Sequence, residues 1–124
     1  MEFSFTGIDH VQLAAPPGCE DEARHFFVDV LGWQELQKPK ALQQRGGVWF
    51  VCGPQQVHIG VQNDFAPALK AHPAFLVKNL PALKARLLLH QIPVKDDEIR
   101  EDEGIRRFFS QDPFGNRLEF METL

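Results

Sequence analysis

The chain has 124 residues, of which 44% are hydrophobic and 24% are charged, and its formal net charge is −4. These values are typical of one globular domain, and without a basic run a nucleic-acid partner is not expected. No stretch approaches the roughly 20 apolar residues of a membrane span, so no membrane partner is expected either, and the first residues lack the basic character of a signal peptide. The two cysteines, Cys19 and Cys52, form no disulfide framework. We therefore expect a cytoplasmic protein that binds a small-molecule substrate.

Residues 5–62 have the pattern of a strand, a helix and three further strands. Residues 5–15 alternate like a strand, with His10 and Gln12 on one face. A Pro-Pro-Gly sequence ends this strand, and acidic residues followed by an apolar stripe of helical period predict a helix that begins at Glu20. Glycine-containing turns then separate the three remaining strands. These are predicted at Trp33–Lys38, Gly47–Cys52 and Gln56–Gln62.

The same order of elements returns in residues 72–123, after a linker over 63–71. A helix is predicted at Leu80–His90, with a proline in its first turn. The sequence Asp112–Asn116 is typical of a turn that joins the last two strands as a hairpin. Strands are predicted at His72–Lys78, Ile92–Asp96, Ile105–Gln111 and Arg117–Thr123. The pattern therefore predicts a single domain over 1–124, built from two βαβββ modules.

Each predicted module begins and ends near a side chain that can bind a metal ion. His10 and His58 are 48 residues apart, and His72 and Glu119 are 47 residues apart. Imidazole nitrogens and carboxylate oxygens suit borderline divalent ions such as Zn, Ni, Fe, Mn or Co. A single buried histidine is more often a hydrogen-bonded structural residue. Four such side chains at matching positions of a repeat favour a shared metal site instead.

These segments resemble the vicinal oxygen chelate superfamily, the group of glyoxalase I, fosfomycin resistance proteins, bleomycin resistance proteins and extradiol dioxygenases. The resemblance extends from about Ile8 to Glu122 and depends on three segments of the chain. It implies an α+β fold in which the two βαβββ modules form a curved mixed sheet around a cup. The segments are Ile8–Val11, His72–Val77 and Phe108–Phe120, the last with an Asp-Pro-x-Gly turn.

By matching position, the resemblance implies four metal ligands around the cup, His10, His58, His72 and Glu119. Glu119 could remain a ligand or detach and act as the catalytic base. Relatives of the glyoxalase I type usually have Glu where this chain has His58, and fosfomycin enzymes use three ligands, so the reaction type stays open. Relatives also often build each cup from modules of two chains, so that His10 of one subunit meets His72 and Glu119 of the other. The resemblance therefore implies a homodimer.

Four further residues are candidates for binding substrate. The family register places Arg107 and Phe109 toward the cup, where Arg107 could bind a carboxylate or phosphate. The alternative is a surface arginine. Gln12 lies one strand step from His10 on the face of the cup. It is either a hydrogen-bond donor that supports the metal ligands or a polar group satisfied by the backbone. Trp49 is either a wall of the cup or a core residue.

Two functions from different classes are compatible with these residues. The first is a small metalloenzyme, a divalent-metal-dependent lyase or dioxygenase, that chelates two neighbouring oxygens of its substrate and catalyses a lyase, isomerase or ring-opening step. The alternative is a metal-free binding protein of the bleomycin-resistance type, whose cup sequesters a ligand. Such binding proteins typically lack the ligand residues. This chain has all four positions, which favours the enzyme.

Overall fold

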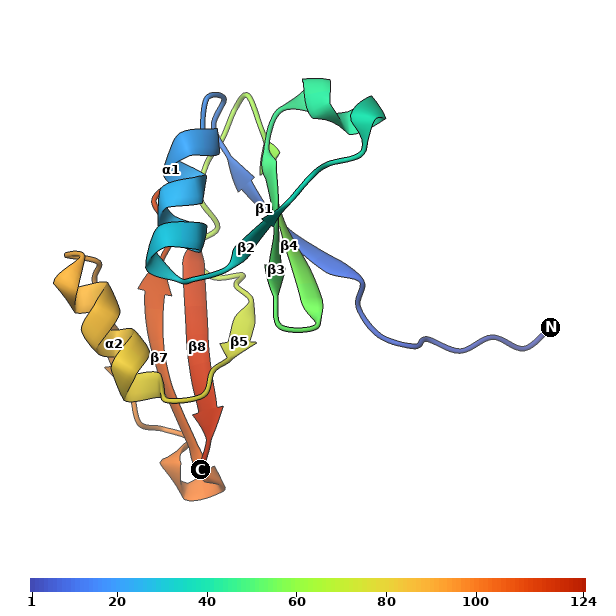
Figure 1. Cartoon of the computed structure of the whole chain (residues 1–124). Coiled ribbons are helices and arrows are strands. Elements are labelled where there is room, and N and C mark those ends of the chain that lie inside the picture. Colours follow the sequence, from blue (N-terminus) through green and yellow to red (C-terminus); the bar gives the residue numbers. More distant parts are fainter.

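The computed structural model describes residues 1–124 as two four-stranded sheets, each accompanied by a helix (Figure 1). The first module contains β1 (His10–Ala15), α1 (Glu20–Arg24) continued by a π-helical segment (His25–Val30), β2 (Gln34–Leu36), a 3₁₀ helix (Lys40–Arg45), β3 (Val48–Cys52) and β4 (Gln55–Val61). The second contains β5 (Ala74–Leu76), α2 (Leu80–Leu89), β6 (Lys95–Asp97), a 3₁₀ helix (Glu101–Glu103), β7 (Ile105–Gln111) and β8 (Arg117–Thr123). Neither helix has the length and apolar character needed to cross a bilayer.

The two sheets share one topology, with strand orders β1-β4-β3-β2 and β5-β8-β7-β6. In each sheet the first and last strands of the module are parallel neighbours, and the other strand pairs are antiparallel. The beginning of each module therefore lies beside its end, so that Gln12 is paired with His58 and Ala74 with Glu119. The prediction of two βαβββ modules in an α+β fold is confirmed.

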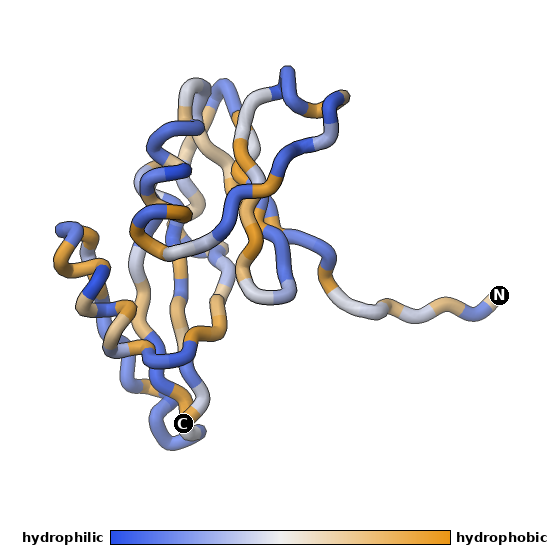
Figure 2. Tube along the Cα trace, viewed as in Figure 1, coloured by the Kyte–Doolittle hydropathy of each residue, from blue (hydrophilic) through white to orange (hydrophobic).

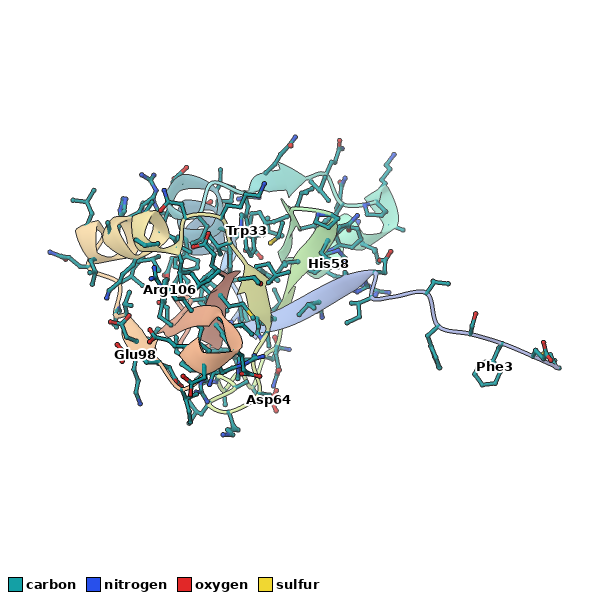
Figure 3. All side chains as sticks on the ribbon, turned by 90° about the horizontal axis from the view of Figure 1, so that it is seen from below. Phe3, Trp33, His58, Asp64, Glu98 and Arg106 are labelled. Atoms are coloured by element: carbon teal, nitrogen blue, oxygen red, sulfur yellow. The ribbon has the colours of Figure 1, made fainter.

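Several boundaries differ from the prediction because a strand needs a partner as well as a pattern. The strand predicted over 5–15 begins at His10, which pairs near the start of β4, and the residues before it have no strand beside them. Residues 1–9 instead form an extended arm that carries Phe3 far from the body of the protein (Figures 1 and 3). Hydrophobic residues continue into this arm (Figure 2).

The edge strands of the second sheet are also shorter than predicted. β5 has three residues, so His72 lies ahead of the strand in the segment that leads to it. β6 begins at Lys95 and not at Ile92, because Pro93 cannot donate a ladder hydrogen bond. The strands β7 and β8, by contrast, have the predicted bounds.

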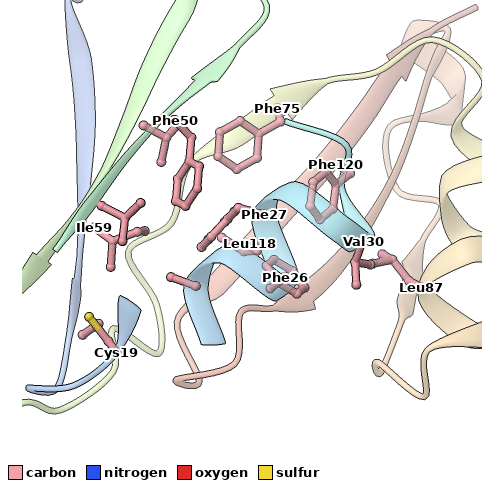
Figure 4. Close-up of a cluster of buried hydrophobic side chains, with 14 of the residues drawn as sticks. Cys19, Phe26, Phe27, Val30, Phe50, Ile59, Phe75, Leu87, Leu118 and Phe120 are labelled. Atoms are coloured by element: carbon pink, nitrogen blue, oxygen red, sulfur yellow. The ribbon is translucent and has the colours of Figure 1, made fainter. Parts of the chain in front are cut away.

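The hydrophobic core lies where α1 and its π-helical continuation are wedged between the two sheets (Figure 4). Phe26 and Phe27 are consecutive and both buried. Consecutive helical residues point about a quarter of a turn apart, so burying both requires apolar surface on two sides of the helix. The first sheet supplies Phe50, whose ring centroid lies 5.2 Å from that of Phe27, and the second supplies Leu118 and Phe120. One helix therefore packs against both modules.

The turn between β7 and β8 ties the second module to the first. The Asp112 carboxylate accepts hydrogen bonds from the backbone N–H groups of Phe114 and Asn116, both at 2.9 Å. The Asn116 amide donates to Asp112 and to the Ala14 carbonyl of β1, both at 2.8 Å, and accepts from the backbone N–H of Ala68. Burial raises the pKa of Asp112, while these donors oppose the increase. The turn predicted from sequence is thus also a junction between modules.

Candidate functional site

His58 lies between two other rings on the face of the first sheet that is turned away from α1. Because β4 separates β1 from β3, His10 stacks on one side of the His58 ring with centroids 4.1 Å apart, and Trp49 stacks on the other at 3.8 Å. The Nε2 atom of His58 is 2.9 Å from the side-chain oxygen of Gln56. Burial, and then the neighbouring His10, lower the pKa of His58. Its ring is therefore neutral near pH 7, with a nitrogen lone pair available to a metal ion.

Gln12 lies on the same face, packed over Gly60. A Cβ atom at position 60 would lie 2.4 Å from Gln12 Nε2, so glycine leaves the space that the glutamine occupies. Gln12 and His72 both line a cavity of about 490 Å³ beside β1. One predicted substrate residue of the first module and one predicted ligand of the second therefore face a common space.

His72 and Glu119 form the corresponding pair of the second module. His72 Nε2 lies 2.9 Å from Glu119 Oε1, and His72 Nδ1 lies 2.8 Å from the Lys70 carbonyl oxygen. A carbonyl only accepts, so Nδ1 carries the hydrogen and Nε2 of a neutral ring presents its lone pair to a carboxylate. These two acceptor atoms repel unless a proton or a metal cation lies between them. The Glu119 side chain is 6% exposed, and its second oxygen is 3.5 Å from Arg107.

Two arginines surround Phe109 beside this pair. The guanidinium carbons of Arg107 and Arg117 lie 5.2 and 4.2 Å from the Phe109 ring centroid, and the His72 ring meets the same phenyl ring edge-on at 5.4 Å. Arg107 also forms an ion pair with Asp97 at 3.2 Å, and its Nε is buried without a partner. Arg117 was missed from the sequence, although it shares its strand face with Glu119 two residues later.

The four predicted ligands form two pairs, one in each module. No group of three or more His, Cys, Asp or Glu side chains in the chain is close enough together to hold a metal ion. The donor atoms are those that borderline divalent ions prefer, but each pair supplies only part of the three or four protein ligands of a typical site. The residues therefore fit a metal ion in their chemistry, and one subunit alone does not bring them together.

Comparison with known proteins agrees with this fold. The family model of the Glyoxalase/Bleomycin resistance protein/Dioxygenase superfamily matches residues 7–120, and the chain belongs to that superfamily. The structure is similar to a glyoxalase family protein from Bacillus anthracis, with 50% identity and a TM-score of 0.94 over 100% of both chains.

Two more distant structures share the fold. Lactoylglutathione lyase from Agrobacterium tumefaciens is 24% identical, with a TM-score of 0.71 over 94% of this chain and 93% of that chain. The genomically encoded fosfomycin resistance protein FosX from Listeria monocytogenes is 14% identical, with a TM-score of 0.78 over 98% of this chain and 96% of the other. No curated protein matches the chain.

Proposed function

We propose that two copies of this chain hold a divalent metal ion at each of two equivalent sites between them and act on a small molecule that offers two neighbouring oxygens. The ligands are His10 and His58 from one subunit and His72 and Glu119 from the other. The observation that carries this proposal is the contact of His72 Nε2 with Glu119 at 2.9 Å, which brings an imidazole nitrogen and a carboxylate oxygen together at a point where a divalent ion could replace the proton between them. A Zn, Ni, Fe, Mn or Co ion suits this mixture of imidazole and carboxylate.

A bound divalent ion would supply Lewis-acid polarisation of the substrate oxygens. The remaining work falls to side chains of the protein. Glu119 is nearly buried, and His72 and Arg107 hold its two oxygens, so its carboxylate is positioned to accept a proton from a bound substrate. Water is largely excluded from this carboxylate, which strengthens its interactions with substrate charge.

The other predicted substrate residues have separate roles in this proposal. Phe109 provides a flat wall between two arginines. Arg107 is already paired with Glu119 and Asp97, so it positions the carboxylate more than it attracts a free anion. Gln12 shares the sheet face of His10 and His58, packed over Gly60, and can donate to a substrate oxygen bound beside that pair. Trp49 holds the His58 ring in place by stacking.

Metal content of the purified and reconstituted protein tests the proposal. We expect about one equivalent of divalent metal per chain, lost in a His72→Ala variant and retained in His90→Ala, a matched change at an exposed histidine after α2. The metal-loaded protein is then screened with methylglyoxal–glutathione hemithioacetal, catechols and fosfomycin-like epoxides. Binding of less than about a tenth of an equivalent, with ligand binding unaffected by His72→Ala, would contradict a metalloenzyme.

A metal-free binding protein is the second candidate. The observation that favours it is the set of flat surfaces, the stacked rings of His10, His58 and Trp49 in one module and the Phe109 ring between two arginines in the other. Such surfaces suit a flat aromatic ligand. A binder of this kind keeps its ligand affinity in the presence of a chelator, whereas the enzyme loses its activity.

A further inference from the structure

The N-terminal arm is an apolar strand without a partner. Phe3, Phe5 and Ile8 are 82%, 91% and 69% exposed, and the Phe3 ring packs edge-on against Phe5 with centroids 5.9 Å apart. In residues 2–6 the two phenylalanines alternate with polar side chains, which is the pattern of a strand with one covered face. The arm leaves the body of its own subunit (Figures 1 and 3). Exposed apolar surface of this kind marks an interaction site.

A matching surface lies at the free edge of β5. This strand is the outermost of its sheet, so one side of its backbone has no neighbouring strand, and its Leu76 is 76% exposed. Beside it lies a cavity of about 250 Å³ in which eight of ten lining residues are hydrophobic, among them Trp33, Phe75 and Leu83. Lys78 is the only charged residue of the lining. An unprotected strand edge next to an apolar cavity is a template for a further strand.

We propose that the arm of one copy adds to β5 of a second copy as an antiparallel strand, with Phe3 and Phe5 over the apolar cavity. Backbone hydrogen bonds together with pockets for alternate side chains are the usual way in which an extended segment binds a sheet edge. The charges also agree, because Glu2 is the acidic residue of the arm's tip and Lys78 is the basic residue of the cavity.

This pairing aligns the two halves of the site, and to that extent it rests on the proposed function. The arm leads directly into His10, and β5 follows shortly after His72. In an antiparallel pair, the residues that follow one strand lie beside those that precede the other. His10 of one copy therefore comes beside His72 of the second copy. The arm is the element that joins the two ligand pairs.

The dimer dissociation constant, measured by sedimentation, tests the docking. We expect a full-length Phe3→Ser/Phe5→Ser variant to dimerise at least about tenfold more weakly than the unmodified chain. Leu76→Lys, at the receiving edge, has a similar effect, and combining the two changes adds little because they disrupt one contact. Leu89→Lys is the matched control, because Leu89 is 77% exposed on α2 and lies outside the proposed contact.

The outcomes separate this inference from the proposed function. An unchanged dimer in Phe3→Ser/Phe5→Ser, an equal loss in Leu76→Lys and Leu89→Lys, or a chain that stays monomeric would overturn the docking. At protein concentrations that keep the arm variant dimeric, it binds Ni²⁺ more weakly than the unmodified dimer, because the two ligand pairs are no longer aligned. A chain that dimerises through the arm and binds no metal contradicts the proposed metal site alone.

Discussion

The two modules have the same topology but hold their candidate ligands in different electrostatic surroundings. In the first module, His58 lies between two rings, and burial lowers its pKa. In the second, Glu119 contacts His72 and Arg107, and Arg107 contacts a further carboxylate. The first pair therefore offers two imidazole nitrogens, and the second offers an imidazole nitrogen and a carboxylate. The repeat determines where ligands lie, and the neighbouring strands determine what kind of ligand each module provides.

The helices of the two modules differ as strongly as their sites. α1 with its π-helical continuation lies between both sheets and buries Ala23, Phe26, Phe27 and Val30 (Figure 4). α2 covers one side of the second sheet and buries only Leu80 and Leu87. Stability should therefore depend more on the first helix than on the second.

The largest expected effect tests this difference between the helices. Phe27→Ala removes a fully buried ring that contacts Phe50 and Trp33, and we expect the free energy of unfolding to fall by about 4 kcal/mol. Leu88→Ala on α2, at a side chain that is 53% exposed, should cost less than about 1 kcal/mol. Urea denaturation measures both. A loss in Phe27→Ala as small as that in Leu88→Ala would contradict a core built around the first helix.

The junction between the modules gives the next largest effect. Asn116→Ala removes the hydrogen bonds to Ala14, Ala68 and Asp112 and leaves a buried carboxylate oxygen without its donor, so we expect a loss of about 3 kcal/mol. The same denaturation experiment on Asn63→Ala, at an exposed linker position, should show almost no change. A small loss in Asn116→Ala would mean that the modules hold together without this turn.

The difference in charge between the two ligand pairs is tested by metal affinity. Because Glu119 carries the negative charge of the proposed site, Glu119→Gln should weaken Ni²⁺ binding by more than about 100-fold, beyond the effect of losing an outer-shell partner. His58→Ala removes one neutral donor and should weaken binding by about tenfold. Calorimetric titration measures both, with His25→Ala as the exposed control. Equal effects of Glu119→Gln and His58→Ala would remove the distinction between the modules.

The smallest effect concerns acidic side chains that accept backbone hydrogen bonds, Glu20 in the first module and Glu122 in the second. Glu20 accepts a hydrogen bond from the Gly47 backbone N–H at 2.7 Å, and this bond lowers the pKa of Glu20. Glu20→Gln should therefore cost about 1 kcal/mol at pH 7. The contribution is complete above the unfolded pKa of a glutamate and disappears as the pH falls through the lower folded value. The difference between the two stabilities should therefore begin to shrink as the pH falls below about 4.3.

Stability measured against pH for the unmodified chain and Glu20→Gln tests this expectation, with Glu22→Gln as the exposed control. A difference that stays constant down to pH 3 would contradict a role for the charge. In the second module, Glu122 accepts hydrogen bonds from the backbone N–H groups of Asn79 and Leu80, and these bonds lower its pKa. Glu20 thus connects the loop at Gly47 to the start of α1. Glu122 connects the start of α2 to β8.

Local pattern predicted the parts of the fold that local chemistry determines. The alternation of β4 predicted that His58 lies on one face of the sheet and that Val57 and Ile59 lie on the other. Both hydrophobic residues are in the core. The turn signal Asp112–Asn116 gave β7 and β8 their observed bounds. The beginning of β1 was wrong, because residues 5–9 have the alternation of a strand but no neighbouring strand in their own subunit.

Side-chain contacts across strands were less accessible to prediction. The stacking of His10, His58 and Trp49 depends on the pairing register of three strands, which no single segment encodes. Arg117 shares its strand face with Glu119, so alternation alone could have identified it. The separation of the ligands into two pairs depends on how the sheets pack around α1, a property of the whole chain.

The parallel pairing of the first and last strands in each module has a consequence for how the protein folds. His10 and His58 are 48 residues apart, and His72 and Glu119 are 47 apart. Closing loops of this length costs more entropy than forming the hairpins β3–β4 and β7–β8. We therefore expect the hairpins to form first and the outer parallel strands to dock onto them later. A chain leaving the ribosome would acquire its second ligand pair only after its final strand has been synthesised.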